Sequence, residues 1–342
     1  LLNDMATTMV NTMKWGVASS VLNTMTNSIR NAYNYSKQLD TALTDIRIVT
    51  GDSADQMGRF AEQANSAAKA FGSNTLDYAK TALSFYQQGL DDDEVASRTE
   101  ATIKAANVTG SQAAQVAEYL TAVWNGFQVG IGEETAYVDK LAAVADSSAS
   151  NLAELATAMS KVASVANNMG VDMDQLNAQI STIIATTRQA PETVGNALKT
   201  IYARINDIKT GSDEAEISLG NYTGKMASLG IQVLDANGHL RDTGDVMEEI
   251  GSKWGSMGRE QQIYLAQTMA GQRQMNNLIA LFDNWNKYTE MLNVSMTAQG
   301  TLEEKNARYL ASTQAHLNTL KSTWQDLYST LLNTDEINTG ID

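Results

Sequence analysis

The side chains able to do chemistry are few in this chain and do not form a recognisable set. The chain has two histidines, His239 and His316, and no cysteine. Neither histidine has the HExxH or HxxxH spacing that places two metal ligands on one helical face. The sequence also lacks a cysteine and a Gly-x-Ser-x-Gly turn, which commonly supply the nucleophile in nucleophilic catalysis. We therefore predict no catalytic, cofactor-binding or metal-binding residue, and no enzyme.

Two acidic motifs could suggest a cation site, but each has a simpler interpretation. The run Asp-Asp-Asp-Glu at residues 91–94 precedes a predicted helix, where carboxylates accept hydrogen bonds from free amides and complement the helix dipole. Residues 235–238 resemble part of a calcium loop, but Leu240 and Val246 stand where that loop needs glycine and glutamate. A carboxylate pair for sugar hydrolysis needs only to meet in space, and nothing in the sequence identifies one.

Charge and hydropathy exclude further classes of protein. The net charge is −15 and the basic residues are scattered, whereas nucleic-acid binding needs clustered lysine and arginine. Residues 130–132 (Gly-Ile-Gly) lack the third glycine and the preceding strand of a dinucleotide motif. The most apolar runs, at 180–185 and 278–282, are far shorter than the ~20 residues needed to span a bilayer. We expect no specific nucleic-acid binding and no membrane span in this segment.

The composition favours an all-α fold punctuated by glycines. Apolar residues make up 43% of the 342 residues, and the single proline, Pro191, permits long helices. Turn signals predict helices over 76–88, from 91, over 112–127, 135–145, 152–168, 172–189, 191–208, 244–254, 259–270, 271–293 and 301–333. We predict four parts: a long N-terminal helix at 1–49, a helical core at 50–210, a second helical subdomain at 211–300, and a coiled-coil-like C-terminal helix at 301–342.

One small β-hairpin is expected near residues 231–242. Apolar and polar residues alternate over 231–234 and over 239–242, and the segment between them carries Asn237-Gly238. An Asn-Gly turn flanked by alternating residues is a strong hairpin signal.

Both ends of the chain carry apolar stripes that we predict to be protein interfaces. In the N-terminal helix the stripe turns around the helix, because a four-residue step exceeds one turn by about 40°. It covers a curved core of its own domain or contacts other copies. In the C-terminal helix, about three heptads form a coiled-coil seam or dock on their own domain. The predicted interface residues are Met5, Met9, Met13, Val17, Val21, Met25, Leu310, Leu317, Leu320, Trp324, Leu327 and Leu331.

Five segments, in a fixed order, carry a resemblance to a known family. They are residues 39–90, 151–208, 229–242, Lys253-Trp254 and 269–284. Each is weakly specific by itself, but their order over about residues 37–330 is specific. The chain resembles the core region of phage tail tape measure proteins.

That resemblance implies a structural protein of the phage tail. Such a protein would lie in the tail lumen or tip of the virion after assembly in the host cytoplasm, in three or six copies that contact tail tube and tail-tip proteins. It would set tail length, nucleate the tail tube and leave with the genome. The chain starts without methionine, and we expect an internal piece of a longer protein: a compact domain at one end of the ruler.

Two other interpretations of the residues stay open. One is a non-viral helical binding or scaffold module, whose terminal helices would pack on its own core. The other is a cell-wall hydrolase, which would need a deep pocket with two converging carboxylates.

Overall fold

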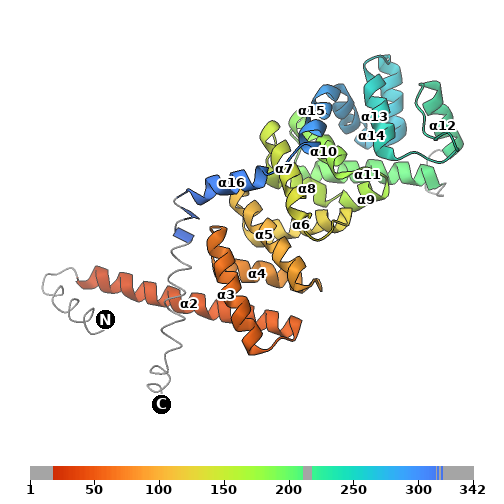
Figure 1. Ribbon diagram of the computed structural model, residues 1–342. Helices are drawn as coiled ribbons and strands as arrows, with labels where there is room; N and C mark the ends of the chain where they lie inside the picture. The colour runs from red at the N-terminus through yellow and green to blue at the C-terminus, as the bar shows by residue number, and fades with distance from the viewer. Residues whose placement is uncertain (1–17, 211–217, 313, 316, 319–342) are drawn as a thin grey trace. The chain divides into compact units, whose positions relative to one another are not determined.

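The computed structural model describes residues 18–210, 218–312, 314–315 and 317–318, with the backbone alone for residues 18–33. These residues form fifteen α-helices and no β-strand (Figure 1), which confirms the predicted all-α class. The chain divides into two compact units. Unit 1 contains the described residues up to Gln88 and from Ser312 onward, and unit 2 is Gly89–Ala311.

Unit 1 is built around three helices. They are α2 (Ala18–Thr50), α3 (Ala54–Ala70) and α4 (Thr75–Tyr86), and α4 packs against both of the others. In the second half of α2, Ala42 and Ile46 face the core. The hydroxyl oxygen of Tyr35 accepts a hydrogen bond from the backbone N–H of Leu76 at 2.6 Å, which ties α2 to the first turn of α4.

Unit 2 contains twelve helices within its described residues. They are α5 (Asp92–Thr109), α6 (Ala113–Phe127), α7 (Glu134–Ser147), α8 (Leu152–Ser160), α9 (Ala163–Asn168), α10 (Met173–Thr187), α11 (Pro191–Thr210), α12 (Leu219–Ser228), α13 (Thr243–Trp254), α14 (Arg259–Asp283), α15 (Trp285–Met296) and α16 (Thr301–Leu310).

Helix α10 is the centre of unit 2. It packs against α7, α8, α9, α11, α14 and α15 (Figure 1), and its residues 175–184 are buried without interruption. A helix buried on every side needs partners for its polar side chains. Asn177 accordingly donates to the Ser295 hydroxyl at 3.2 Å and to the Lys140 carbonyl at 3.0 Å.

The predicted helix starts are confirmed at three capping boxes. In each, two residues three positions apart bond to one another. The side chain of the N-cap residue accepts from the backbone N–H of the later residue, and the side chain of the later residue accepts from the backbone N–H of the N-cap residue. The pairs are Asp91 with Glu94, Asn151 with Glu154, and Asp172 with Gln175. The acidic run at 91–94 therefore caps α5, as predicted. Pro191 is the first residue of α11, where its missing N–H costs no hydrogen bond.

The prediction of one helix over residues 152–168 is wrong. The chain leaves the helix at Lys161 and Val162, between α8 and α9. No glycine or proline stands there, but two neighbouring helices lie against the break. A Cβ at Gly195 of α11 would lie 2.2 Å from the Ala158 carbonyl oxygen, and a Cβ at Gly126 of α6 would lie 2.8 Å from the Ser164 nitrogen. Two helices thus approach the break closely enough to require glycine.

Helix α12 was not expected, because residues 211–230 carry four glycines and few large apolar groups. Its N-cap is Ser218, whose side chain accepts from the N–H of Asn221. Tyr222 and Met226, one turn apart, are almost fully buried. Packing of this single apolar stripe outweighs the low helix propensity of Gly220 and Gly224.

The predicted hairpin forms a chain reversal without strands. Leu234 and Leu240 make one isolated antiparallel bridge, and the reversal is closed by hydrogen bonds from Asp235 to His239 and from Arg241 to Val233. The expected strands are wrong, because these contacts do not continue into a ladder. The N–H and carbonyl of Gln232 bond to the side chains of Glu249 and Arg241 and not to an opposite strand.

Two more differences concern the last helices. The predicted break before residue 271 is confirmed by Gly271, whose φ of +67° interrupts α14, and a further break at Asn284 separates α14 from α15. The single helix predicted over 301–333 is wrong, because α16 ends at Leu310 and is followed by a turn at Ala311 and Ser312.

Candidate interaction surfaces and polar networks

The predicted interface residues are only partly within the described chain. Val21 and Met25 lie in α2, where the backbone alone is described. Leu310 is the last residue of α16 and is half-buried, while Leu317 lies in unit 1 and is 48% exposed. The remaining eight, outside the described residues, are Met5, Met9, Met13, Val17, Leu320, Trp324, Leu327 and Leu331. Their role as contact residues stays a prediction.

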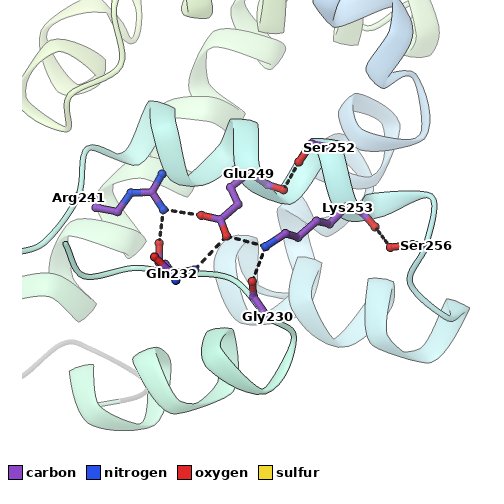
Figure 2. A network of polar contacts seen from close by, with 7 residues as sticks. All are labelled: Gly230, Gln232, Arg241, Glu249, Ser252, Lys253 and Ser256. Atoms are coloured by element: carbon purple, nitrogen blue, oxygen red, sulfur yellow. Dashed lines mark hydrogen bonds and ion pairs between the residues drawn. The ribbon is translucent and has the colours of Figure 1, made fainter. Parts of the chain in front are cut away.

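The clearest polar cluster holds the segment 231–242, here called the hairpin loop, against α13. The Glu249 carboxylate is its centre (Figure 2). It pairs with Arg241, accepts from Lys253 Nζ at 2.7 Å, and accepts from the backbone N–H of Gln232 at 3.3 Å. Arg241 Nη1 also donates to the Gln232 carbonyl at 2.6 Å, and Lys253 donates to the Gly230 carbonyl. We call this set the Glu249 network.

The Glu249 network depends on the charge of its central carboxylate. Partial burial opposes ionisation of Glu249, but the hydrogen bonds from Lys253, Arg241 and Gln232 outweigh burial and lower the pKa of Glu249 below its ordinary value of 4.5. Its side chain is 18% exposed, so the pair with Arg241 is better shielded from solvent than a surface ion pair.

The end of the hairpin loop is fixed by α11 and by the α9–α10 connection. Lys209 Nζ donates to the Arg241 carbonyl at 2.8 Å and to the Thr243 hydroxyl at 3.0 Å. Burial lowers the pKa of Lys209, against the nearby charge of Asp242, which raises it. The first N–H groups of α13 bond to the carbonyls of Met169 and Gly170, because Asp242 supplies no side-chain cap.

Helix α16 is fixed by side chains from α5 and α7. The Asp139 carboxylate accepts from the backbone N–H of Gly300 at 2.8 Å and of Leu302 at 2.7 Å. Gly300 has no side chain to cap α16, so Asp139 of α7 does so. Lys104 of α5 bonds to Glu303 at 2.5 Å; burial lowers its pKa, but Glu100 and Glu303 outweigh that effect and raise it.

A buried charge pair joins α5 to the start of α7. Arg98 and Glu134 lie 3.8 Å apart with side chains 7% and 1% exposed. The Glu134 carboxylate accepts from Ser97 Oγ at 2.8 Å and from the Gly132 N–H at 2.7 Å, and the Arg98 guanidinium lies over the Trp124 ring. Buried charges persist only with such partners, so this cluster orders the α6–α7 connection.

These polar groups hold helices together. Across the described ranges, no three His, Cys, Asp or Glu residues come together as a metal site, and no helix is long and apolar enough to cross a membrane. His239 Nδ1 lies 3.6 Å from the Asp235 carboxylate, and the His239 side chain is 79% exposed. His316 lies outside the described residues.

The Glu249 network, the cap of α16 by Asp139 and the Arg98–Glu134 pair were not predicted from the sequence. Glu249 and Lys253 are four residues apart on one helix, a spacing that signals an ion pair. Nothing local connects Asp139 with Gly300, or Arg98 with Glu134, because each pair depends on which helices meet.

The comparisons with known proteins give the class of protein. The profile of the phage-related minor tail protein family matches residues 63–271, more than half of the chain. The chain belongs to this family of structural tail proteins, which are not enzymes.

A particular relative sharpens this assignment and confirms the resemblance inferred from the sequence. The chain is 20% identical to the tape measure protein of Pneumococcus phage Dp-1 over 268 residues. The match covers 78% of this chain and 22% of that protein, so the chain spans about a fifth of its relative's length. No solved structure matches the chain.

Proposed function

We propose that this chain is a compact segment of a tape measure protein that sets tail length and nucleates tail tube assembly. The protein would lie in the tail lumen or tail tip and leave with the genome at ejection. The single observation that supports this most is the match to a tape measure protein over 78% of the chain, within a minor tail protein family.

The shape of the described helices fits a segment at one end of a ruler. An α-helix rises 1.5 Å per residue, so a long helix makes a natural ruler. Apart from α2, no described helix exceeds the 25 residues of α14, which is itself interrupted at Gly271, and unit 2 folds back around α10. We infer that length is measured elsewhere in the protein and that this segment supplies a folded end.

Deletions in the full-length protein test this division, with tail length measured by electron microscopy. Deleting helical residues of the ruler should shorten tails by about 1.5 Å per residue. Deleting α10 should instead abolish or arrest tails, since the core of unit 2 would be lost. Complete tails of normal length and infectivity after the α10 deletion would contradict the proposal.

We further propose that other copies of the chain and the tail tube or tail-tip proteins cover the apolar stripes at the two ends. Among described residues, the exposure of Leu317 supports this. Three or six copies would match the symmetry of a tail. The Leu317→Asp variant should lower the native mass of the assembly, because a charge would enter the contact.

Ile48→Asp is a matched control for that experiment. Ile48 lies in the same unit and is 75% exposed, but it is outside both stripes. Its assembly mass should stay that of the unmodified protein. If the Leu317→Asp variant and the unmodified protein had equal assembly masses, the proposal that the C-terminal apolar stripe is a protein interface would be wrong.

A further inference from the structure

The hairpin loop contains a dipeptide with chemistry of its own. Asn-Gly occurs twice in the sequence, at Asn125-Gly126 and Asn237-Gly238. Both asparagines are exposed to solvent, so exposure does not distinguish them. Their backbones differ: the first pair lies inside α6, and the second lies in the turn of the hairpin loop.

Asparagine followed by glycine can lose ammonia without any enzyme. The backbone nitrogen of the glycine attacks Cγ of the asparagine side chain and forms a new N–C bond. The bond from Cγ to the amide nitrogen breaks, and ammonia leaves with the proton that the backbone nitrogen has lost. Water then opens the five-membered ring at either carbonyl, giving aspartate or isoaspartate. Glycine favours the attack because it has no Cβ to obstruct it.

The fold restrains this reaction at Asn125. The backbone nitrogen of Gly126 belongs to the helical hydrogen-bond ladder of α6, and Arg98 donates to the Asn125 side-chain oxygen at 3.2 Å. Gly126 is also packed against α9, since a Cβ there would lie 2.6 Å from Ala163 Cβ. The attack therefore requires α6 to unravel locally.

The restraint at Asn237 is much weaker. Gly238 has a φ of +82° and nothing within 4 Å of the position of a Cβ. Its N–H bonds to the Asp235 carbonyl at 3.1 Å, and besides one isolated bridge the reversal is closed by two backbone hydrogen bonds and by the Asp235 side chain, all within residues 233–241 at the surface. The Asn237 side chain makes no hydrogen bond to any described part of the chain. A turn held this lightly opens far more often than a packed helix.

We propose that Asn237 is a site of spontaneous deamidation and that the fold protects Asn125 from the same reaction. The product places a second carboxylate next to Asp235, whose side chain already accepts from the N–H groups of Asn237 and His239. In the isoaspartate form the main chain gains one methylene inside the turn. The bridge between Leu234 and Leu240 then loses its register.

Incubation of the folded full-length protein at mildly alkaline pH, followed by peptide mass mapping, tests the proposal. The peptide with residue 237 should gain the mass difference between NH and O, in both aspartate and isoaspartate forms. The peptide with residue 125 should react at least about tenfold more slowly than the peptide with residue 237. An unreacted Asn237, or equal rates at the two sites, overturns the proposal.

Two controls separate the fold from the local sequence. In denaturant, Asn125 and Asn237 should react at similar rates. If the difference in rate persisted there, flanking side chains would be its cause, and the protective role of α6 would be overturned. The Asn237→Gln variant keeps an amide at this position and should abolish the mass gain of that peptide. A gain that persists in this variant would place the reaction elsewhere and overturn the assignment.

Discussion

The break between α8 and α9 and the hairpin loop both interrupt the helices of unit 2, but they are held in different ways. At the break, glycines of α6 and α11 let two helix backbones approach within contact distance of the chain. At the hairpin loop, the Glu249 network joins backbone carbonyls to charged side chains. The first junction depends on shape, and the second on charge. The first should therefore be sensitive to added side-chain volume, and the second to pH and salt.

The largest effect is expected from a single methyl group at the first junction. In Gly195→Ala the new Cβ would lie 2.2 Å from the Ala158 carbonyl oxygen, and backbone atoms cannot move aside cheaply. We expect the free energy of unfolding to fall by about 1–3 kcal/mol or more, measured by urea denaturation. Gly220→Ala is the control, because open space surrounds Gly220 in α12 and alanine should stabilise that helix by about 0.5–1 kcal/mol. Equal effects of the two substitutions would refute the role of close approach.

A smaller effect is expected where charge caps a helix. Asp139→Ala leaves the N–H groups of Gly300 and Leu302 without their acceptor, which should cost about 1–2 kcal/mol of stability. Asp146→Ala on the same helix removes only an exposed partner of Lys305 and should cost a few tenths of a kcal/mol. Thermal melting of both variants checks this, and a similar loss in the two would argue against the cap.

The charge-held junction should respond to acid. Because the pKa of folded Glu249 lies below 4.5, its stabilising contribution is complete above that pH and is lost as pH falls through the folded pKa. Glu249→Gln should destabilise the hairpin loop by about 1 kcal/mol at pH 7, and the difference from the unmodified protein should shrink below pH 4.5. Hydrogen exchange of the Arg241 N–H, which bonds to Val233, reports this. A difference that stays constant with pH would contradict it.

The smallest effect is expected from salt. Raising the ionic strength to about 1 M shortens the screening length to about 3 Å and weakens partly exposed ion pairs. Exchange of the Arg241 N–H should become modestly faster. Exchange of the Val162 N–H, which bonds to Met159 at the break, should not change in the same way, because shape holds that junction. If salt accelerated exchange equally at Arg241 and Val162, the two junctions would not differ in their dependence on charge.

Much of the helical order could be predicted from the sequence because the signals act within one helical turn. Asp91, Asn151 and Asp172 each cap a helix through a bond to a residue three positions on. Pro191 starts α11 for the same local reason. The ion pair of Glu249 and Lys253 could have been found in this way as well.

The polar clusters and the irregular joints could not be predicted, because their causes lie far away along the chain. Asp139 caps α16 across an interval of more than 160 residues. The break at Lys161 lies against Gly195 of α11, a contact that no local pattern in residues 152–168 predicts. Helix α12 forms on glycine-rich residues because Tyr222 and Met226 find a place to be buried.

The amino-acid sequence by itself determined the all-α class, most helix starts and the kinship with phage tail proteins, since caps, periodicity and motif order are carried by neighbouring residues. Tertiary structure alone decided where helices break, which carboxylate caps which helix, and that the hairpin loop closes with one bridge. Those outcomes depend on which surfaces meet, and a linear pattern does not contain the distances between them.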